Sequence, residues 1–401
     1  MPEISNRGIE LSESPIRNLM PYARAAKQRG NHVYHLNIGQ PDIETPTSAL
    51  ERVKSIKNKI VAYGPSEGLP ELRKTVASYY DKFDASIEAE NVYVTTGASE
   101  AIQMAFLSTC DRGDEVIIPE PFYANYLGFA HLAGIKIVPL TTQLEDAFEL
   151  PEVEAFREKI TPNTKAIFLC NPGNPTGKLY SKKDLLRLAE IVIERDLFLI
   201  VDEVYREFCY DQVFTSVLSI PGLEKNAIVI DSISKVFSSC GARVGYLISK
   251  NEAFLSSVNK IAQLRLCPPF FGQQMAIGCY EESSIYIEQA IAEYRKRRDF
   301  IYKALSEIPD IKSYKPDAAF YNMVELPVDD AQDFCKFLLK DFNMNNETVM
   351  LSPGNGFYST ETVIKNQVRI AYILKVEDLS KSIEILQEAL VAYAQAKIGH
   401  F

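Results

Sequence analysis

The sequence predicts an α/β fold, because short apolar runs rich in β-branched residues alternate with amphipathic stretches. Each run is continuously apolar rather than alternating, as a sheet buried on both faces requires. We therefore expect a large, mostly parallel sheet of seven strands. The seven runs are 92–95, 115–118, 135–139, 166–170, 197–201, 227–231 and 243–248.

The clearest helix is predicted to begin at Ser181, where Ser181 and Asp184 form a capping-box pattern before a run of apolar residues at helical spacing. The stretch NPGNPTGK (171–178) precedes it, so this turn is expected at the carboxyl end of a strand, where ligands bind in open α/β sheets. It is not a nucleotide P-loop. Only three residues separate its two glycines, and Leu179 follows the lysine where a P-loop needs Ser or Thr.

The pattern of apolar residues at the two ends of the chain differs from that in the middle. Residues 1–47 show no clear period, while the pattern after about residue 285 changes to long helices such as 375–397 and a strand-like run at 367–373. We predict a large ligand-binding domain over 48–285 and a smaller α+β domain. That second domain combines the N-terminal segment 1–47 with residues 286–401.

Composition favours a small-molecule partner. The 401 residues carry a formal net charge of -10, with 43 Lys and Arg against 53 Asp and Glu, which gives no basis for binding nucleic acid or an anionic membrane. Seven scattered cysteines, with no Cys-x-x-Cys pair, and four histidines suggest neither a metal site nor a disulfide scaffold. No signal peptide or membrane span is visible, so we expect a cytoplasmic protein.

Chemically specific residues follow several of the predicted strands. After 92–95, Gly97, Ala98 and Ser99 fall at a helix start, whose free N–H groups attract anions such as phosphate. Asp202 ends the strand 197–201 and needs a partner to offset its burial.

The run 227–231 leads into Ser232 and Lys235, and Arg243 lies eight residues beyond that lysine. One ligand could use all of these groups. A phosphate would bind Ser99, Ser232 and Arg243, a cationic ring nitrogen would pair with Asp202, and an aldehyde would bond to Lys235. Pyridoxal phosphate carries all three groups.

The chain resembles the class I and II aminotransferases, the fold type I pyridoxal-phosphate enzymes typified by aspartate aminotransferase. The matching stretches span nearly the whole chain in the order of the family. They are LNIGQPD (36–42), YGPSEGLPELR (63–73), TTGASEAI (95–102), EPFYANY (120–126), NPGNPTGK (171–178), VDEVY (201–205), SISKVFSSCGARVGY (232–246) and QVRIAY (367–372).

This resemblance implies a role for each matching residue around the cofactor. Lys235 would bind the cofactor covalently and act as general base and acid, and Asp202 would keep the pyridine nitrogen protonated. Tyr205 and Asn174 would contact the ring oxygen O3′, and Tyr123 would stack on the ring. Gly97, Ala98, Ser99, Ser232 and Arg243 would belong to the phosphate site.

The resemblance also implies a shared active site. Tyr63 corresponds to a tyrosine that reaches the phosphate of the neighbouring subunit, so a homodimer is expected. Gly39, Asn174 and Arg369 would meet at the substrate carboxylate, which a planar guanidinium binds through two parallel hydrogen bonds. No metal is expected.

The sequence departs from common family patterns at two positions. Ala242 stands where many relatives have an aromatic residue, which suggests a roomier or repacked site. Ser99 stands where relatives specific for dicarboxylic substrates can carry lysine. Recognition of a distal carboxylate must then come from elsewhere, with Arg265 and Arg17 as candidates, or be absent.

The favoured function is transfer of an amino group between an L-amino acid, aspartate or an aromatic one, and a 2-oxo acid such as 2-oxoglutarate. One alternative keeps the fold but breaks a different bond, as in a β-lyase that acts on cysteine conjugates. A second alternative is a non-catalytic pyridoxal-phosphate sensor. The complete set of catalytic residues and the lack of a basic DNA-binding helix disfavour it.

Overall fold

The computed structural model describes residues 2–11, 17–359 and 364–398. Its centre is a seven-stranded sheet in the order β2-β8-β7-β6-β5-β3-β4. β8 runs antiparallel to both neighbours and all other pairs are parallel, which confirms the predicted fold class. The strands are β2 (Val92–Thr95), β3 (Glu115–Glu120), β4 (Lys136–Thr141), β5 (Thr164–Cys170), β6 (Phe198–Asp202), β7 (Ala227–Ser232) and β8 (Gly245–Ile248).

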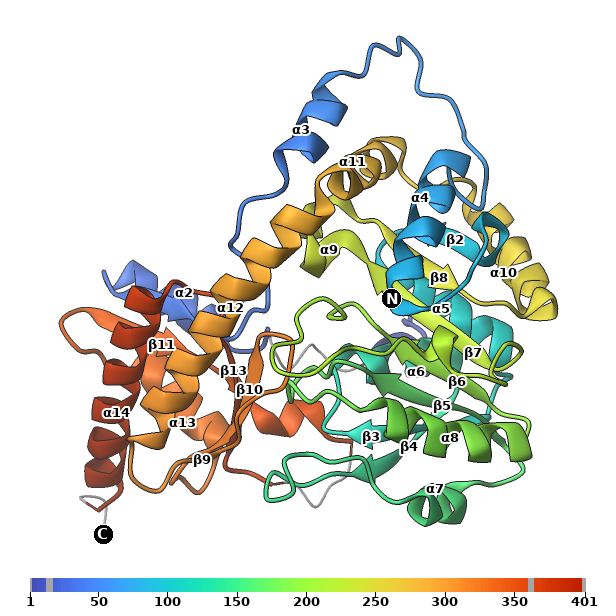
Figure 1. Ribbon diagram of the computed structural model, residues 1–401. Coiled ribbons are helices and arrows are strands. Elements are labelled where there is room, and N and C mark those ends of the chain that lie inside the picture. The colour runs from blue at the N-terminus through green and yellow to red at the C-terminus, as the bar shows by residue number, and fades with distance from the viewer. Residues whose placement is uncertain (1, 12–16, 360–363, 399–401) are drawn as a thin grey trace.

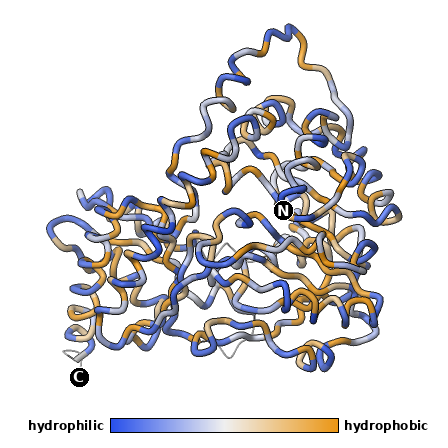
Figure 2. Tube along the Cα trace, viewed as in Figure 1, coloured by the Kyte–Doolittle hydropathy of each residue, from blue (hydrophilic) through white to orange (hydrophobic). Residues whose placement is uncertain are grey.

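Both faces of this sheet are buried, which explains the continuous apolar runs. In β5, Ile167 and Leu169 belong to one apolar cluster while Ala166 and Phe168 belong to another on the opposite face. Figure 2 shows these strands as hydrophobic segments inside the molecule. The nearby helices are α4 (Pro70–Tyr80), α5 (Ala98–Thr109), α6 (Asn125–Ala133), α7 (Val153–Lys159), α8 (Lys182–Glu194), α9 (Ile233–Val236), α10 (Glu252–Arg265) and α11 (Phe270–Glu281).

The predicted helix start at Ser181 is confirmed. The side chain of Ser181 accepts a hydrogen bond from the backbone N–H of Asp184, and the Asp184 carboxylate accepts one from the N–H of Ser181. Leu185, Leu188 and Val192 are buried on one face of α8. The capping pair fixes where the helix begins, and so fixes the turn 171–178 at the end of β5.

One strand boundary differs from the prediction. The run 243–248 becomes a strand only at Gly245, because Cys240–Ala242 form a 3-10 turn and Arg243 has a φ of 54°. A residue in this left-handed region cannot join a strand. Arg243 therefore lies in the turn before β8, on the side of the sheet where β7 ends.

The remaining elements pack beside the large sheet (Figure 1). They form a four-stranded sheet, β12-β13-β10-β9, and a parallel pair, β1 with β11. The strands are β1 (His32–His35), β9 (Lys312–Ser313), β10 (Tyr321–Glu325), β11 (Glu347–Met350), β12 (Ser352–Pro353) and β13 (Gln367–Ala371). The helices are α1 (Asn6–Glu10), α2 (Met20–Gln28), α3 (Thr47–Lys54), α12 (Ser283–Ser306), α13 (Ala331–Lys340) and α14 (Val376–Ile398).

The pairing of β1 with β11 joins residues 32–35 to residues 347–350, from opposite ends of the chain. It is compatible with a small domain built from both chain ends. The long helix α12 runs without interruption through the predicted boundary at residue 285. The division at residues 47 and 285 stays a prediction.

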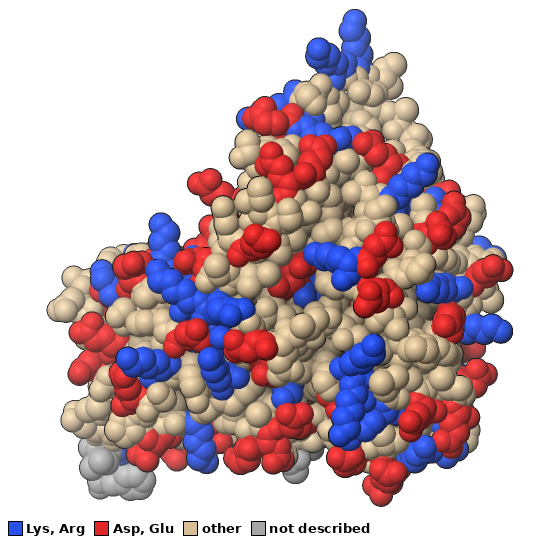
Figure 3. All heavy atoms as spheres, viewed as in Figure 1, with Lys and Arg blue, Asp and Glu red and all other residues tan. Residues whose placement is uncertain are grey.

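The surface carries mixed charge. Figure 3 shows Lys and Arg interspersed with Asp and Glu over the visible face. No helix in the described ranges is long and apolar enough to cross a bilayer. Within those ranges, no three His, Cys, Asp or Glu side chains are grouped so that they could hold a metal ion.

Candidate active site

A cavity of about 770 Å³ lies at the carboxyl ends of β5, β6 and β7. The segment around α2, the residues after β1, and strands β10 and β13 complete its wall. Eleven of the predicted site residues line it: Gly39, Ala98, Ser99, Tyr123, Asn174, Asp202, Tyr205, Ser232, Lys235, Arg243 and Arg369. Gly97 and Tyr63 are the predicted site residues outside this lining.

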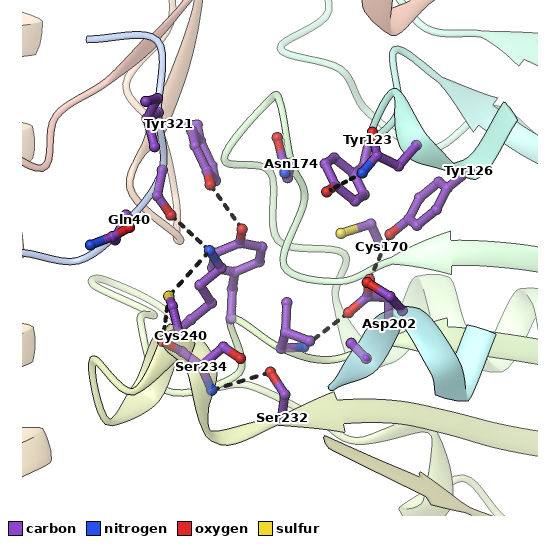
Figure 4. Close-up of a pocket in the computed structure, with 18 of the residues that line it drawn as sticks. Gln40, Tyr123, Tyr126, Cys170, Asn174, Asp202, Ser232, Ser234, Cys240 and Tyr321 are labelled. Carbon is purple, nitrogen blue, oxygen red and sulfur yellow. Dashed lines mark hydrogen bonds between the residues drawn. The ribbon is translucent and has the colours of Figure 1, made fainter. Parts of the chain in front are cut away.

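Asp202 is held at the cavity floor as the last residue of β6, with 4% of its surface exposed. Its carboxylate accepts hydrogen bonds from the Tyr126 hydroxyl at 2.7 Å and from the backbone N–H of Val204 at 3.2 Å (Figure 4). Burial raises the pKa of Asp202 to about 6, although both hydrogen bonds favour the charged form. A cationic ligand atom would compensate for this burial.

Lys235 lies in the short helix α9, directly after β7. Its Nζ donates a hydrogen bond to the carbonyl oxygen of Gly39 at 2.7 Å and lies 3.9 Å from Cys240 Sγ. Burial lowers the pKa of Lys235, and the charges of Arg369 and Arg243 lower it further. This shift increases the share of the neutral amine, which is the nucleophilic form, relative to a free lysine.

The start of α5 lines the same cavity as Lys235. Gly97 precedes the helix with a φ of 74°, and no side chain caps the helix start. A Cβ at this position would lie 2.3 Å from Nη2 of Arg243, so only glycine lets the guanidinium approach the helix start. Gly97 therefore shapes the site without lining the cavity.

Arg369, on β13, is a buried cation in the wall of the cavity, with 2% of its surface exposed. It makes no ion pair with any residue that the structure describes. Its Nη1 donates to Asn174 Oδ1 at 2.9 Å, and its Nε has no partner within those residues. Burial lowers the pKa of Arg369, because it disfavours the charged guanidinium. A buried cation without an ion pair in the described residues is the kind of group that an anionic ligand would stabilise.

Tyr321 is a cavity residue that the sequence did not reveal. The hydroxyl oxygen of Tyr321 lies 2.9 Å from that of Tyr205. A Cβ added to Gly39 would lie 1.7 Å from the Tyr321 hydroxyl oxygen. Tyr126, the partner of Asp202, was also missed. Both look like ordinary core aromatics in the sequence, and no local pattern separates them from structural tyrosines.

Tyr63 and Arg265, the latter a candidate for binding a distal carboxylate, do not line the cavity. Tyr63 is 81% exposed on the loop between α3 and α4, which projects from the molecule in Figure 1. Arg265 pairs with Glu100 at 2.8 Å and donates to the carbonyl oxygen of Ser66 at 2.7 Å. Ala242 does not line the cavity and packs against the core of the large sheet.

The fold is shared with a known family of enzymes. A family model described as aminotransferase class I and II matches residues 31–386, and the chain belongs to this family. The resemblance found in the motifs is thereby confirmed. Members of this family work with pyridoxal phosphate.

Individual relatives cover almost the entire chain. A probable aspartate aminotransferase of Methanocaldococcus jannaschii is 32% identical over 394 residues, which cover 96% of this chain and 99% of the relative. The aspartate aminotransferase of Pyrococcus horikoshii is 32% identical and covers 96% of this chain and 97% of the relative.

Solved structures agree with these relatives. The aspartate aminotransferase of Thermotoga maritima superposes with a TM-score of 0.88 at 29% identity, covering 96% of this chain and 100% of that one. An alanine aminotransferase of Pyrococcus furiosus gives a TM-score of 0.89 at 31% identity, covering 97% of this chain and 100% of that one. The protein is an aminotransferase, and the differing names of its relatives leave the amino acid open.

Proposed function

We propose that this aminotransferase holds pyridoxal phosphate in the cavity and moves an amino group between an L-amino acid and a 2-oxo acid, with aspartate and 2-oxoglutarate as the favoured pair. The observation that carries the proposal is a single cavity lined by Lys235, Asp202, Arg243 and Arg369. Several relatives are named aspartate aminotransferases, which supports that choice of substrates.

The residues present fit the proposed cofactor. The uncapped start of α5, with Ser232 and Arg243, offers donors and positive charge to a phosphate. The raised pKa of buried Asp202 is consistent with a carboxylate that a cationic ring nitrogen would stabilise in its charged form. The lowered pKa of Lys235 fits an amine that bonds to an aldehyde. Three chemically different groups of one ligand thus find matching side chains.

When bound, the cofactor supplies an electron-accepting ring that lets the α-proton of the amino acid leave. Lys235 would take that proton at Nζ and return it. Asp202 would hold the proton on the ring nitrogen, and the Tyr205 hydroxyl would face the ring oxygen. Tyr123 would cover one face of the ring and exclude water from it.

The substrate would be oriented by its α-carboxylate. Arg369 would bind this group through its guanidinium, and Asn174, already bonded to Arg369, would keep the guanidinium in place. Gly39 would let Tyr321 approach beneath the carboxylate, since any side chain there meets the tyrosine hydroxyl.

A homodimer with shared sites is part of the proposal. The exposed loop carries Ile60 and Tyr63, which are 78% and 81% exposed, as expected of residues that contact a second subunit. A cytoplasmic location is also proposed. All seven cysteines are free, as is usual in a reducing compartment.

Chemical trapping tests the cofactor assignment. The purified protein is reduced with borohydride, digested and mapped, and the pyridoxyl group is expected on Lys235. A Lys235→Ala variant is the control and should carry no label. A label on another lysine in the wild type would refute the assignment.

The reaction is tested with each amino acid in turn, while the absorbance of the bound cofactor is followed. Aspartate should change the spectrum, and 2-oxoglutarate should restore it. Repeated release of pyruvate together with ammonia from a cysteine conjugate, in excess over the enzyme and without any 2-oxo acid acceptor, would instead indicate a β-lyase.

A further inference from the structure

A buried ion pair lies behind the strand ends that carry the proposed cofactor site. Arg206, in the turn after β6, donates to the carboxylate of Asp231 on β7, and the side chains of both residues are fully buried. Asp202 pairs with Ile230 in the sheet, so the side chain of Asp231, the next residue, lies on the opposite face. Neither member of the pair lines the cavity. The mechanism proposed above gives the pair no role.

The carboxylate of Asp231 is held by three donors. Besides Arg206, it accepts a hydrogen bond from the Tyr80 hydroxyl on α4 at 3.0 Å and another from the backbone N–H of Ser232 at 2.6 Å. The guanidinium carbon of Arg206 lies 5.5 Å from the centroid of the Tyr80 ring. Asp231 thus connects a helix, the turn after β6 and the end of β7 at one point inside the protein.

Ser232 extends this restraint to the cavity. Its side chain accepts a hydrogen bond from the N–H of Ser234 at 3.3 Å and so caps α9, the short helix that carries Lys235 (Figure 4). Ser232 also lines the cavity as one of the proposed phosphate donors. At the other end of the ion pair, Arg206 comes four residues after Asp202. The pair therefore joins the residues that would hold the aldehyde of one rigid ring to the residue that would hold its nitrogen.

Stability alone does not account for this ion pair. Burial raises the pKa of Asp231 to about 6, although the charge of Arg206 opposes the shift. Taking two charges out of water costs free energy that their attraction roughly offsets, so apolar side chains of similar volume often give an equally stable or more stable protein. The pair does fix direction, because each of its hydrogen bonds requires a particular distance and angle.

We propose that Asp231, anchored by Arg206, is a positioning residue for the transfer of the amino group. Its bond to Ser232 sets Lys235 at the distance from Asp202 that the bound cofactor requires. The inference rests on the proposed function, because this distance matters only when one rigid ligand contacts both residues. Groups at an active site must be held within about 0.5 Å of their productive positions, and a displacement of about 1 Å can slow a reaction about 100-fold.

A double substitution, Arg206→Met with Asp231→Leu, tests the proposal because it removes both charges and leaves no unpaired ion. Urea unfolding should show unchanged or higher stability. Equilibrium dialysis of the full-length holoenzyme against pyridoxal phosphate should show about 10- to 100-fold weaker binding, the loss expected for a hydrogen bond to a charged group. The kcat for aspartate should fall about 10- to 100-fold. KM should change little, because Arg369 belongs to a different sheet.

A second double variant keeps the hydrogen-bond acceptor. Arg206→Met with Asp231→Asn also removes both charges, but the amide oxygen can still accept from Ser232, so cofactor binding and kcat should recover most of the loss. The matched control is Arg298→Met with Asp211→Leu. It removes an ion pair of 2.6 Å whose residues do not line the cavity, and it should leave cofactor binding and kcat unchanged.

Tyr80→Phe provides the same test if the leucine variant fails to fold, because it deletes one hydrogen bond to Asp231 and keeps the ring. It should lower kcat about 2- to 12-fold with KM unchanged. Wild-type kcat and cofactor affinity in a folded leucine variant or in Tyr80→Phe would overturn the inference. So would an equal loss in the asparagine variant or in the Arg298 control.

Failure of the proposed function would give a different result. The wild type would then carry no borohydride label on Lys235 and would transaminate no amino acid. If the wild type takes the label and transaminates aspartate, but the folded variants match it in kcat and in cofactor affinity, the function stands and the positioning role of Asp231 is refuted.

Discussion

The hydroxyl groups of Tyr205 and Tyr321 lie 2.9 Å apart in the wall of the cavity. Tyr205 follows β6 of the large sheet and Tyr321 begins β10 of the smaller one, so this contact joins the two sheets beside the site. The guanidinium carbon of Arg369 also lies 4.6 Å from the centroid of the Tyr321 ring. Tyr321 thus contacts both the tyrosine that would face the cofactor and the arginine that would bind the substrate.

Tyr321→Phe should lower kcat/KM about 2- to 12-fold, because it removes one hydrogen bond worth about 0.5 to 1.5 kcal/mol. The ring stays and should preserve the contact with Arg369. Steady-state kinetics with aspartate measure the change. Tyr372→Phe is the control, since this buried tyrosine bonds to the carbonyl oxygen of Ala319 and does not line the cavity. An equal loss in the control would indicate a packing effect.

Arg369→Ala should raise KM for every amino acid and every 2-oxo acid alike, because all of them carry the α-carboxylate. Removing one side of a buried, charge-assisted pair costs about 2 to 5 kcal/mol, or about 30-fold to several thousand-fold in affinity. KM is measured with aspartate, alanine and phenylalanine. The absorbance of the bound cofactor should stay unchanged. A loss confined to aspartate would mean that Arg369 binds the side-chain carboxylate instead.

Tyr63 should complete the site of a neighbouring subunit. Tyr63→Ala and Lys235→Ala chains, each inactive or strongly weakened alone, should regain roughly a quarter of wild-type activity when mixed and reassembled. Half of the dimers would then be hybrids, and each hybrid would hold one intact site of two. Sedimentation analysis gives the oligomeric state. A fully active monomer would contradict this prediction.

Glu203 should make the protein less stable as the pH rises. It is fully buried beside Asp202 and accepts hydrogen bonds from the Ser216 hydroxyl at 2.9 Å and the Val217 N–H at 2.9 Å, yet burial raises its pKa to about 8. The protonated form is therefore favoured on folding. Its contribution to stability is complete below about pH 4.5, the ordinary pKa, and is lost as the pH rises through about 8.

Glu203→Gln is neutral at every pH, so it should remove this loss. A pKa difference of one corresponds to about 1.4 kcal/mol. Between about pH 5 and pH 9, the free energy of unfolding of the wild type should fall relative to the variant by more than that amount. Chemical denaturation measures both proteins, with the exposed Glu190→Gln as the control. Parallel curves for wild type and Glu203→Gln would contradict the expected titration.

Local pattern was enough to predict the large sheet and the capped helix at Ser181, because burial on both faces and helix capping act within a few residues. Asp202 and Lys235 were also predictable, since polar residues after apolar strands gather at one edge of a parallel sheet. The places of Tyr321 and Tyr126 in the cavity wall were not. Each depends on distant segments packing together, and a tyrosine in a strand or a helix looks ordinary in isolation.

The pairing of β1 with β11 has a consequence for how the chain is made. Residues 32–35 hydrogen-bond with residues 347–350, about three hundred positions later. Synthesis proceeds at about 5 to 20 residues per second, so β11 is translated roughly 15 to 60 seconds after β1. The large sheet, complete by residue 248, can form during that interval. The smaller sheets can therefore form only late in translation, after the strands that carry Asp202 and lead into Lys235 have been made.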